Sequence, residues 1–271
     1  MNFYGLLGES LIHSHSPSLH KLIYQKVGLD AAYKLFAFPP AQLKQAMDGI
    51  RTLSINGVNI TIPYKEAVIP YLDEVGPLAK KMGAVNTIEN ANGKLIGHNT
   101  DYAGFGLILS RRQWEVNGKI AVILGSGGAS KTVEAYLMDY GIKMIYIVSR
   151  RPERFKNTEN KRYTNYEEAQ SLMGDFLINT SPVGMYPNIN QSPLSEKTIQ
   201  QFDYLIDLVY NPSETTFLRL GRENNKQTAN GLDMLVGQAV RAIEIWEKCS
   251  IGEQVTEELI SEWKTKNGEN L

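Results

Sequence analysis

Short apolar runs alternate with helical patterns along the first hundred residues. Strands are predicted at 3–8, 32–38 and 57–62, and helices near 17–27, 41–53 and 64–73. In the third strand the alternation of period two places Val58, Ile60 and Ile62 on one face. Asn59 and Thr61 then share the other face. Strands that alternate with helices in this way favour a mainly parallel sheet.

A hairpin is predicted after these elements, because Ala91-Asn92-Gly93 lies between the short strands 87–90 and 94–97. A helical run from Tyr102 to Leu109 follows it.

A second pattern begins near Lys119, where the apolar runs become continuous. They lie at 120–124, 144–148, 175–178 and 204–209, with a helix expected at 128–140. Continuous runs are typical of parallel strands that are buried on both faces, and the order of elements is that of a doubly wound sheet. An amphipathic helix at about 233–249 ends the pattern, and we expect it to pack back on the first part of the chain.

The predicted fold class is therefore α/β, with an N-terminal, mainly parallel α/β domain and a Rossmann-type doubly wound domain. The first domain is expected to comprise residues 1–103 with 235–271, and the second residues 104–234.

Composition and charge exclude several classes of function. The net charge of −1 gives no overall basic field, so we expect no nucleic-acid partner and no membrane partner. The single cysteine, Cys249, excludes an internal disulfide and is expected to pack on a helix face, and no metal site is predicted. The N-terminus lacks the pattern of a signal peptide and no apolar run approaches the ~18 residues of a membrane span, which favours a cytoplasmic protein.

A glycine-rich turn, Gly125-Ser126-Gly127-Gly128-Ala129-Ser130, lies between a predicted strand and a predicted helix. Glycines there allow backbone to approach a pyrophosphate closely, and the helix N-terminus offers free N–H groups. The alternative is an ordinary glycine-rich turn of an α/β protein.

The end of the next strand discriminates between dinucleotides. An NAD-binding protein carries an acidic residue there, whereas this chain has Ser149, Arg150, Arg151 and Arg154. Guanidinium groups and a hydroxyl suit a 2′-phosphate, so NADP(H) is favoured over NAD. A solvated basic loop, with Glu153 paired to one arginine, is the alternative.

Two pairs of polar residues in the first predicted domain are candidates for substrate binding and catalysis. Ser14 and Ser16 precede a predicted helix N-terminus and suit a carboxylate, although simple capping would also explain Ser16. Lys65 is predicted in the first turn of a helix, a poor place for a cation unless it is solvated or functional. Asp101 could cap its own helix, or it could hold and orient Lys65 as a proton donor.

These residues lie in motifs that, in this order, resemble those of the shikimate dehydrogenase family over nearly the whole chain. The motifs are Ser14-x-Ser16-x-x-x-His20, Asn59-Ile60-Thr61-x-Pro63-x-Lys65, Gly83-Ala84-Val85-Asn86-Thr87, Gly97-x-Asn99-Thr100-Asp101, Gly125-x-Gly127-Gly128-Ala129, Asn179-Thr180-Ser181-Pro182-x-Gly184-Met185, Asp207-x-x-Tyr210-x-Pro212 and Gly231-Leu232-x-Met234-Leu235-x-x-Gln238.

The resemblance implies an oxidoreductase that reversibly reduces 3-dehydroshikimate to shikimate with NADPH, in aromatic amino acid biosynthesis. We expect a monomer or a homodimer. It implies direct hydride transfer, with Lys65 and Asp101 as the catalytic pair. Substrate contacts are implied for Ser14, Ser16, Asn59, Thr61, Lys65, Asn86, Asp101, Tyr210 and Gln238. Contacts with the dinucleotide, in addition to the turn and the arginines, are implied for Thr180, Ser181, Leu208, Gly231 and Met234.

The chain departs from the family pattern at three places: Lys21 follows His20, Ser126 replaces the usual alanine, and Arg150-Arg151 replaces Asn-Arg. None of these removes a group assigned to chemistry. Two rival interpretations remain, an NAD-dependent quinate/shikimate enzyme and a binding protein that has kept the fold and lost catalysis.

Overall fold

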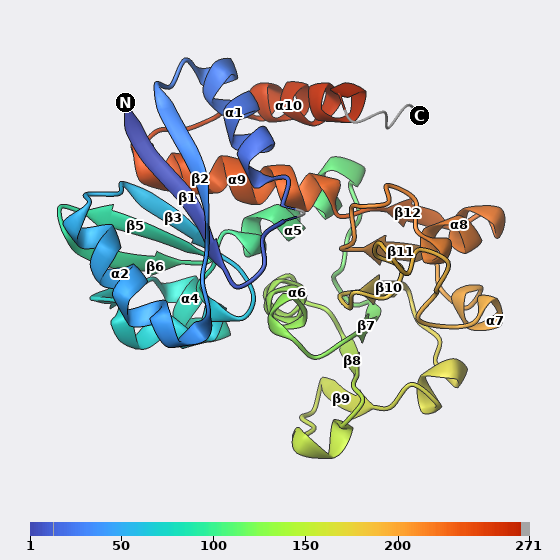
Figure 1. Ribbon diagram of the computed structural model, residues 1–271. Coiled ribbons are helices and arrows are strands. Elements are labelled where there is room, and N and C mark those ends of the chain that lie inside the picture. The colour runs from blue at the N-terminus through green and yellow to red at the C-terminus, as the bar shows by residue number, and fades with distance from the viewer. Residues whose placement is uncertain (13, 267–271) are drawn as a thin grey trace. The chain divides into compact units, whose positions relative to one another are not determined.

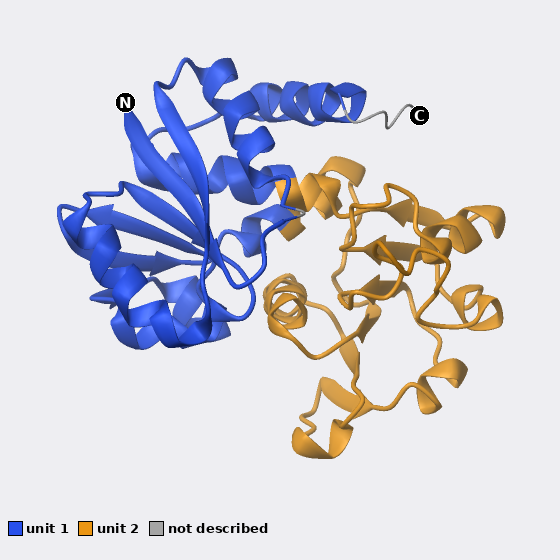
Figure 2. Cartoon of the chain, in the orientation of Figure 1, with its two compact units in different colours: residues 1–104, 236–271 blue, residues 105–235 orange. Residues whose placement is uncertain are grey.

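The computed structural model describes residues 1–12 and 14–266, which form two compact units (Figures 1 and 2). Unit 1 comprises residues 1–104 and 236–271, and unit 2 comprises residues 105–235. The predicted domain limits stand one residue from these, and residues 267–271 of the first predicted domain lie outside the described residues. Both boundaries fall inside helices, α5 (Asp101–Arg112) and α9 (Leu232–Glu247).

Unit 1 is built on a six-stranded sheet in the order β2-β1-β3-β5-β6-β4. Its strands are β1 (Asn2–Gly8), β2 (Ala31–Ala37), β3 (Gly57–Ile60), β4 (Glu74–Val75), β5 (Thr87–Ala91) and β6 (Lys94–His98). The pairs β1–β2, β1–β3 and β4–β6 are parallel, whereas β3–β5 and β5–β6 are antiparallel. The mainly parallel α/β unit predicted from the sequence is therefore confirmed.

Helices and single turns connect these strands. They are α1 (Ser16–Val27), η1 (Pro40–Gln42), α2 (Leu43–Thr52), α3 (Tyr64–Ala67), η2 (Ile69–Tyr71), α4 (Pro77–Met82) and, after α9, α10 (Glu253–Lys266). The helix predicted at 64–73 is wrong in length, because it is split into α3 and η2. Pro70 has no N–H to give to the preceding turn, and its ring collides with the carbonyl four residues earlier.

The strand predicted at 57–62 is also too long. Val58 and Ile60 are 0% and 2% exposed in the core of unit 1, but Ile62 is 78% exposed. The Tyr64 N–H donates to the Thr61 carbonyl, so the chain turns at Ile62 instead of continuing in the sheet. The prediction that Ile62 shares the buried face is therefore wrong.

The predicted hairpin is confirmed. Ala91 of β5 pairs with Lys94 of β6, which leaves Asn92 and Gly93 as the two central residues of the turn. Their φ angles of 55° and 90° lie in the left-handed region, which asparagine and glycine tolerate best.

Unit 2 is built on a six-stranded sheet in which every pair is parallel. Its strands are β7 (Ile120–Leu124), β8 (Met144–Val148), β9 (Lys161–Thr164), β10 (Phe176–Asn179), β11 (Tyr204–Asp207) and β12 (Gln227–Ala229). The order β9-β8-β7-β10-β11-β12 is that of a doubly wound dinucleotide-binding sheet. The Rossmann-type unit is therefore confirmed, although the short and polar strands β9 and β12 escaped prediction.

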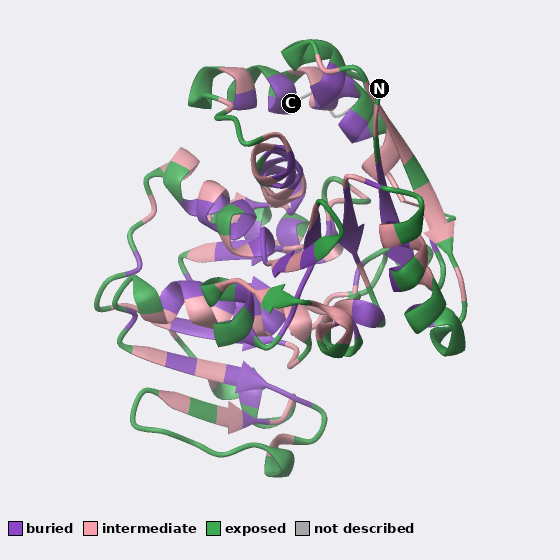
Figure 3. Cartoon of the chain, turned by 90° about the vertical axis from the view of Figure 1, so that its left-hand side faces the viewer, coloured by how far each residue is buried: buried purple, intermediate pink, exposed green. Residues whose placement is uncertain are grey.

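The remaining elements of unit 2 are α6 (Gly128–Asp139), η3 (Pro152–Arg154), η4 (Glu168–Ser171), α7 (Glu196–Ile199) and α8 (Thr216–Glu223). Buried residues concentrate in the central strands, whereas the helices expose their outer faces (Figure 3). In the described part of the chain, no helix is both long and apolar enough to cross a membrane.

The C-terminal part of α9 packs on the sheet of unit 1, as the amphipathic pattern predicts. The Trp246 indole N–H donates to the Ile88 carbonyl at 2.9 Å, and its ring stacks on Tyr4 with 4.5 Å between centroids. Cys249 lies beyond the end of α9 and is exposed, so the prediction that it packs on a helix face is wrong.

The first part of α9 is held within unit 2 by a buried carboxylate. Asp233, 1% exposed, accepts from Arg111 at 2.6 Å and from Arg112 at 2.5 Å, both on α5. The pairs join the two helices that pass between the units. Because Asp233 is buried between two cations, removing either partner would leave a charge poorly compensated.

Gly57 should tolerate no side chain, because a Cβ there would lie 2.2 Å from the Trp246 indole nitrogen. We expect Gly57→Ala to destabilise the chain by about 1–3 kcal/mol, as for other overpacked cores. Urea unfolding followed by circular dichroism measures the change.

Gly49→Ala is the matched control for this substitution. Gly49 lies in α2, where an added Cβ meets no atom within 4 Å, so alanine should stabilise the helix by about 0.5–1 kcal/mol. Equal effects of the two substitutions would contradict the packing argument.

Candidate active site

Two serine hydroxyls stand at the start of α1. The Ser16 N–H donates to Ser14 Oγ at 3.3 Å, and the two hydroxyls lie 3.2 Å apart. Residue 15 occupies the cap position, without a side-chain capping bond, and the first turn carries no acidic residue. The interpretation of Ser16 as a simple cap is therefore wrong. The hydroxyls adjoin the positive end of the helix dipole, where an anion is stabilised.

Lys65 and Asp101 form an ion pair. Lys65 lies in the first turn of α3, Asp101 is the first residue of α5, and the ammonium nitrogen stands 2.7 Å from Asp101 Oδ2. The side chains are only 21% and 11% exposed, so the solvated alternative for Lys65 is wrong. Partial burial strengthens the attraction, and the carboxylate holds the ammonium in one direction.

A buried network connects this pair to the centre of the sheet. The Asn59 amide donates to Thr87 Oγ1 at 3.0 Å, and the Asn86 amide donates to Thr100 Oγ1 at 3.0 Å. Asn86 Oδ1 in turn accepts from the Thr100 N–H at 2.7 Å, immediately before Asp101. The Asn86 oxygen is thus committed to the fold.

The other predicted substrate residues are divided between the units. Thr61, which follows β3, and Gln238, on α9, belong to unit 1 with the serines, the asparagines and the ion pair. Tyr210 follows β11 in unit 2, and burial raises the pKa of its phenol. Eight of the nine predicted substrate residues therefore lie in unit 1.

The predicted phosphate turn follows β7 in unit 2. Gly125 has a φ of +115°, and a Cβ there would lie 2.8 Å from Thr180 Oγ1, so only glycine fits. Gly127 caps α6 without a side-chain bond, and no acidic residue follows in the first turn. The N–H groups of α6 and its dipole are thus available to an anion, and the residues fit a dinucleotide pyrophosphate.

The basic loop follows β8. Ser149 is 5% exposed, lies 3.1 Å from the Ser126 hydroxyl, and accepts from the Arg151 N–H at 3.2 Å. This contact joins the phosphate turn to the loop that carries the three exposed arginines, Arg150, Arg151 and Arg154.

Sequence reasoning assigned no role to a network at the ends of β10 and β11. Asp207, fully buried, accepts from the Asn179 amide at 2.9 Å, from the Val209 N–H at 3.0 Å and from Thr215 Oγ1 at 2.6 Å. Asn179 Oδ1 accepts from the Ser181 hydroxyl at 2.7 Å. Burial raises the pKa of the Asp207 carboxyl to about 6. The sequence signal for this network was Asp207, an acidic residue within an otherwise apolar strand. Through Asn179, the network orients Ser181.

The remaining predicted cofactor residues lie at the same edge of the sheet. Gly231 approaches Leu208 so closely that a Cβ would lie 2.1 Å from the Leu208 carbonyl oxygen. Met234 follows in the first turn of α9. Unit 2 therefore gathers every predicted dinucleotide residue at the carboxyl ends of its strands, the position at which such sheets bind ligands.

The fold and these residues define a class, the two-unit α/β dehydrogenases in which a Rossmann-type unit accompanies a second α/β unit, here one that carries a lysine–aspartate ion pair. The chain belongs to the shikimate dehydrogenase family. Residues 6–88 match the family described as "Shikimate dehydrogenase substrate binding domain".

Relatives of known name and structure match nearly the whole chain. The shikimate dehydrogenase (NADP(+)) of Clostridium beijerinckii is 46% identical over 263 residues, which are 96% of this chain and 97% of the relative. The crystal structure of shikimate dehydrogenase 1 from Peptoclostridium difficile has a TM-score of 0.93 at 44% identity, covering 98% of this chain and 99% of that one. A Thermus thermophilus structure in complex with NADP(H) and shikimate has a TM-score of 0.85 at 30% identity, covering 97% and 99%.

A buried histidine beside the site predicts a response to acid. His20 is fully buried, neither ring nitrogen has a hydrogen-bond partner among the described residues, and burial lowers its pKa from 6.5 to about 3. Between these values only the unfolded chain takes up a proton. The free energy of unfolding therefore falls as the pH drops through this range.

We expect His20→Phe to remove this contribution. Between pH 7 and pH 4.5 the unmodified chain should lose about 2 kcal/mol more stability than the variant, measured by urea unfolding at each pH. Equal losses would show that His20 is not held neutral.

Proposed function

We propose that this chain is an NADP-dependent shikimate dehydrogenase that reversibly reduces 3-dehydroshikimate to shikimate, a step of aromatic amino acid biosynthesis. The observation that carries the proposal is the 2.7 Å ion pair of Lys65 and Asp101, held beside a buried amide and hydroxyl network in a chain of this family.

The substrate is a carboxylic acid that carries hydroxyl groups, and unit 1 offers partners for both. Ser14 and Ser16, at the α1 N-terminus, suit the carboxylate. Asn59, Thr61 and Gln238 suit the hydroxyls, as does Tyr210 of unit 2. Asn86 contributes through its remaining amide N–H, because its oxygen is already engaged by Thr100 and Thr87.

Catalysis at the ketone requires a proton as well as a hydride. When bound, the dinucleotide supplies the hydride. Lys65 gives a proton to the oxygen on which negative charge develops, and takes it back when a hydroxyl is oxidised. Asp101 keeps the ammonium aimed at that oxygen.

The phosphate turn, Ser149 and the arginines support NADP(H) as the cofactor. The turn and the α6 N-terminus suit the pyrophosphate, while Arg150, Arg151 and Arg154 suit the 2′-phosphate. Thr180, Ser181, Leu208, Gly231 and Met234 suit the remainder of the dinucleotide.

Every residue of the proposed site comes from one chain, so activity is expected from a monomer or a homodimer. We further propose a cytoplasmic location, supported by the exposed free thiol of Cys249, which suits a reducing compartment.

Lys65→Ala is expected to lower kcat for shikimate oxidation about 10²- to 10⁴-fold, the usual contribution of a general acid–base group. Binding of NADP+ should be nearly unchanged, because Lys65 lies in the other unit from the phosphate turn. Steady-state kinetics and fluorescence titration with NADP+ measure the two effects.

Lys94→Ala is the matched control, since Lys94 forms an ion pair of the same 2.7 Å length with Glu74 but is 54% exposed. Retention of normal turnover by Lys65→Ala would overturn the assignment.

Arg150→Ala is expected to raise KM for NADPH roughly 10- to 100-fold while leaving KM for NADH unchanged, because one charged hydrogen bond to the 2′-phosphate is lost. A matrix of NADPH and NADH against 3-dehydroshikimate and dehydroquinate measures this preference.

Arg162→Ala, an exposed arginine on β9, is the control for a general loss of positive charge. Equal use of both dinucleotides by the unmodified chain, with no effect from any of the three loop arginines, would favour the NAD-dependent rival.

A further inference from the structure

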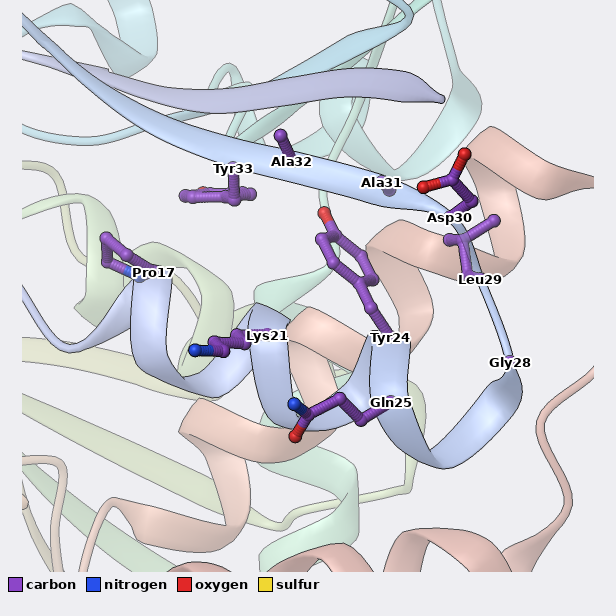
Figure 4. A pocket seen from close by; sticks show the side chains of 10 residues that line it. All are labelled: Pro17, Lys21, Tyr24, Gln25, Gly28, Leu29, Asp30, Ala31, Ala32 and Tyr33. Atoms are coloured by element: carbon purple, nitrogen blue, oxygen red, sulfur yellow. The ribbon is translucent and has the colours of Figure 1, made fainter.

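Tyr33 of β2 reaches from the sheet of unit 1 toward α1. Figure 4 shows its ring at one end of a cavity of about 640 Å³ that runs between α1 and β2, with Pro17 and Tyr24 on the helix side. The ring stacks on the buried His20 ring, with 4.0 Å between centroids and 13° between planes. No predicted substrate or cofactor residue lines this cavity.

The Tyr33 hydroxyl is hydrogen-bonded to a residue of the proposed site. It donates to Asn59 Oδ1 at 2.7 Å. Burial raises the pKa of Tyr33 well above its ordinary value, against a smaller opposite effect of Ser16. The phenol therefore keeps its proton and remains a donor.

The partners of Asn59 determine the direction of these bonds. Its amide nitrogen faces Thr87 Oγ1 at 3.0 Å and the Asn86 carbonyl at 3.4 Å. A carbonyl can only accept, so the nitrogen must point there and Oδ1 must point toward Tyr33. The Tyr33 proton is therefore donated to Asn59 Oδ1.

We propose that Tyr33 is a positioning residue for substrate binding, whose hydroxyl holds Asn59 in the orientation in which it receives a hydroxyl group of a hydroxylated carboxylic acid. The inference rests on the proposed function, in which Asn59 serves a hydroxyl of the substrate.

The proposal separates binding from chemistry. In the part of the chain that the structure describes, the Tyr33 hydroxyl bonds to Asn59 and to neither member of the ion pair, in which Lys65 donates to Asp101. Losing it should therefore weaken binding of the acid and leave proton transfer intact. His20 provides a flat and neutral support for the ring, so the ring should keep its place without its hydroxyl.

Tyr33→Phe and Tyr24→Phe form a matched pair. Tyr24 lines the same cavity and is 4% exposed, but its hydroxyl has no hydrogen-bond partner among the described residues. Tyr33→Phe should raise KM for shikimate about three- to tenfold, the usual effect of one hydrogen bond, with kcat within about twofold. KM for NADP+ should not change, and Tyr24→Phe should match the unmodified chain in every constant.

A double-mutant cycle tests whether Tyr33 acts through Asn59. In an Asn59→Ala background, Tyr33→Phe should change KM for shikimate by less than about twofold, because the group it positions is gone. Thermal unfolding of each variant separates this result from a general loss of stability.

The outcomes are distinct. An unchanged KM for Tyr33→Phe, or an undiminished effect in the Asn59→Ala background, overturns the inference while the proposed function stands. Failure of the unmodified chain to oxidise shikimate overturns the proposed function and this inference with it.

Discussion

The need to satisfy buried polar groups governs unit 1. Asn59, Asn86, Thr87 and Thr100 are nearly inaccessible, and each finds its partners on a neighbouring strand or at the start of α5. An unpaired amide or hydroxyl at these depths would cost more than the net gain of an ordinary hydrogen bond. The same bonds that hold β3, β5 and α5 together therefore bring Asp101 to Lys65. One set of side chains thus has both a structural role and a proposed chemical role.

Unit 2 meets a different constraint, the close approach of backbone segments at the carboxyl edge of a parallel sheet. Gly125 against Thr180, and Gly231 against Leu208, leave no room for a Cβ. The hydrogen bond between Asn179 and Asp207 joins the ends of β10 and β11, from which two of these loops start. A surface made of backbone N–H groups, hydroxyls and short loops results, and such a surface suits a polyanionic ligand better than apolar packing does.

Two helices, α5 and α9, have residues in both units. α5 begins with Asp101 in unit 1 and ends with Arg111 and Arg112 in unit 2, while α9 begins with Asp233 in unit 2 and carries Trp246 in unit 1. Buried ion pairs anchor both helices in unit 2, and an indole hydrogen bond anchors α9 in unit 1. Groups with proposed roles in the reaction thus sit on elements that are fixed at both ends.

The sequence by itself determined the alternation of elements, the doubly wound unit, the glycine-rich turn and most of the residues with proposed chemical roles. These features are local, because period, glycine spacing and residue type are visible along the chain. It failed at the ends of elements, where a periodic pattern runs past the point at which the backbone breaks: Pro70 splits a predicted helix, Ile62 turns outward, and Cys249 lies beyond its helix. Only the tertiary structure joined Lys65 to Asp101 and Tyr33 to Asn59, since partners 36 and 26 residues apart are set by strand order and packing, which no local pattern records.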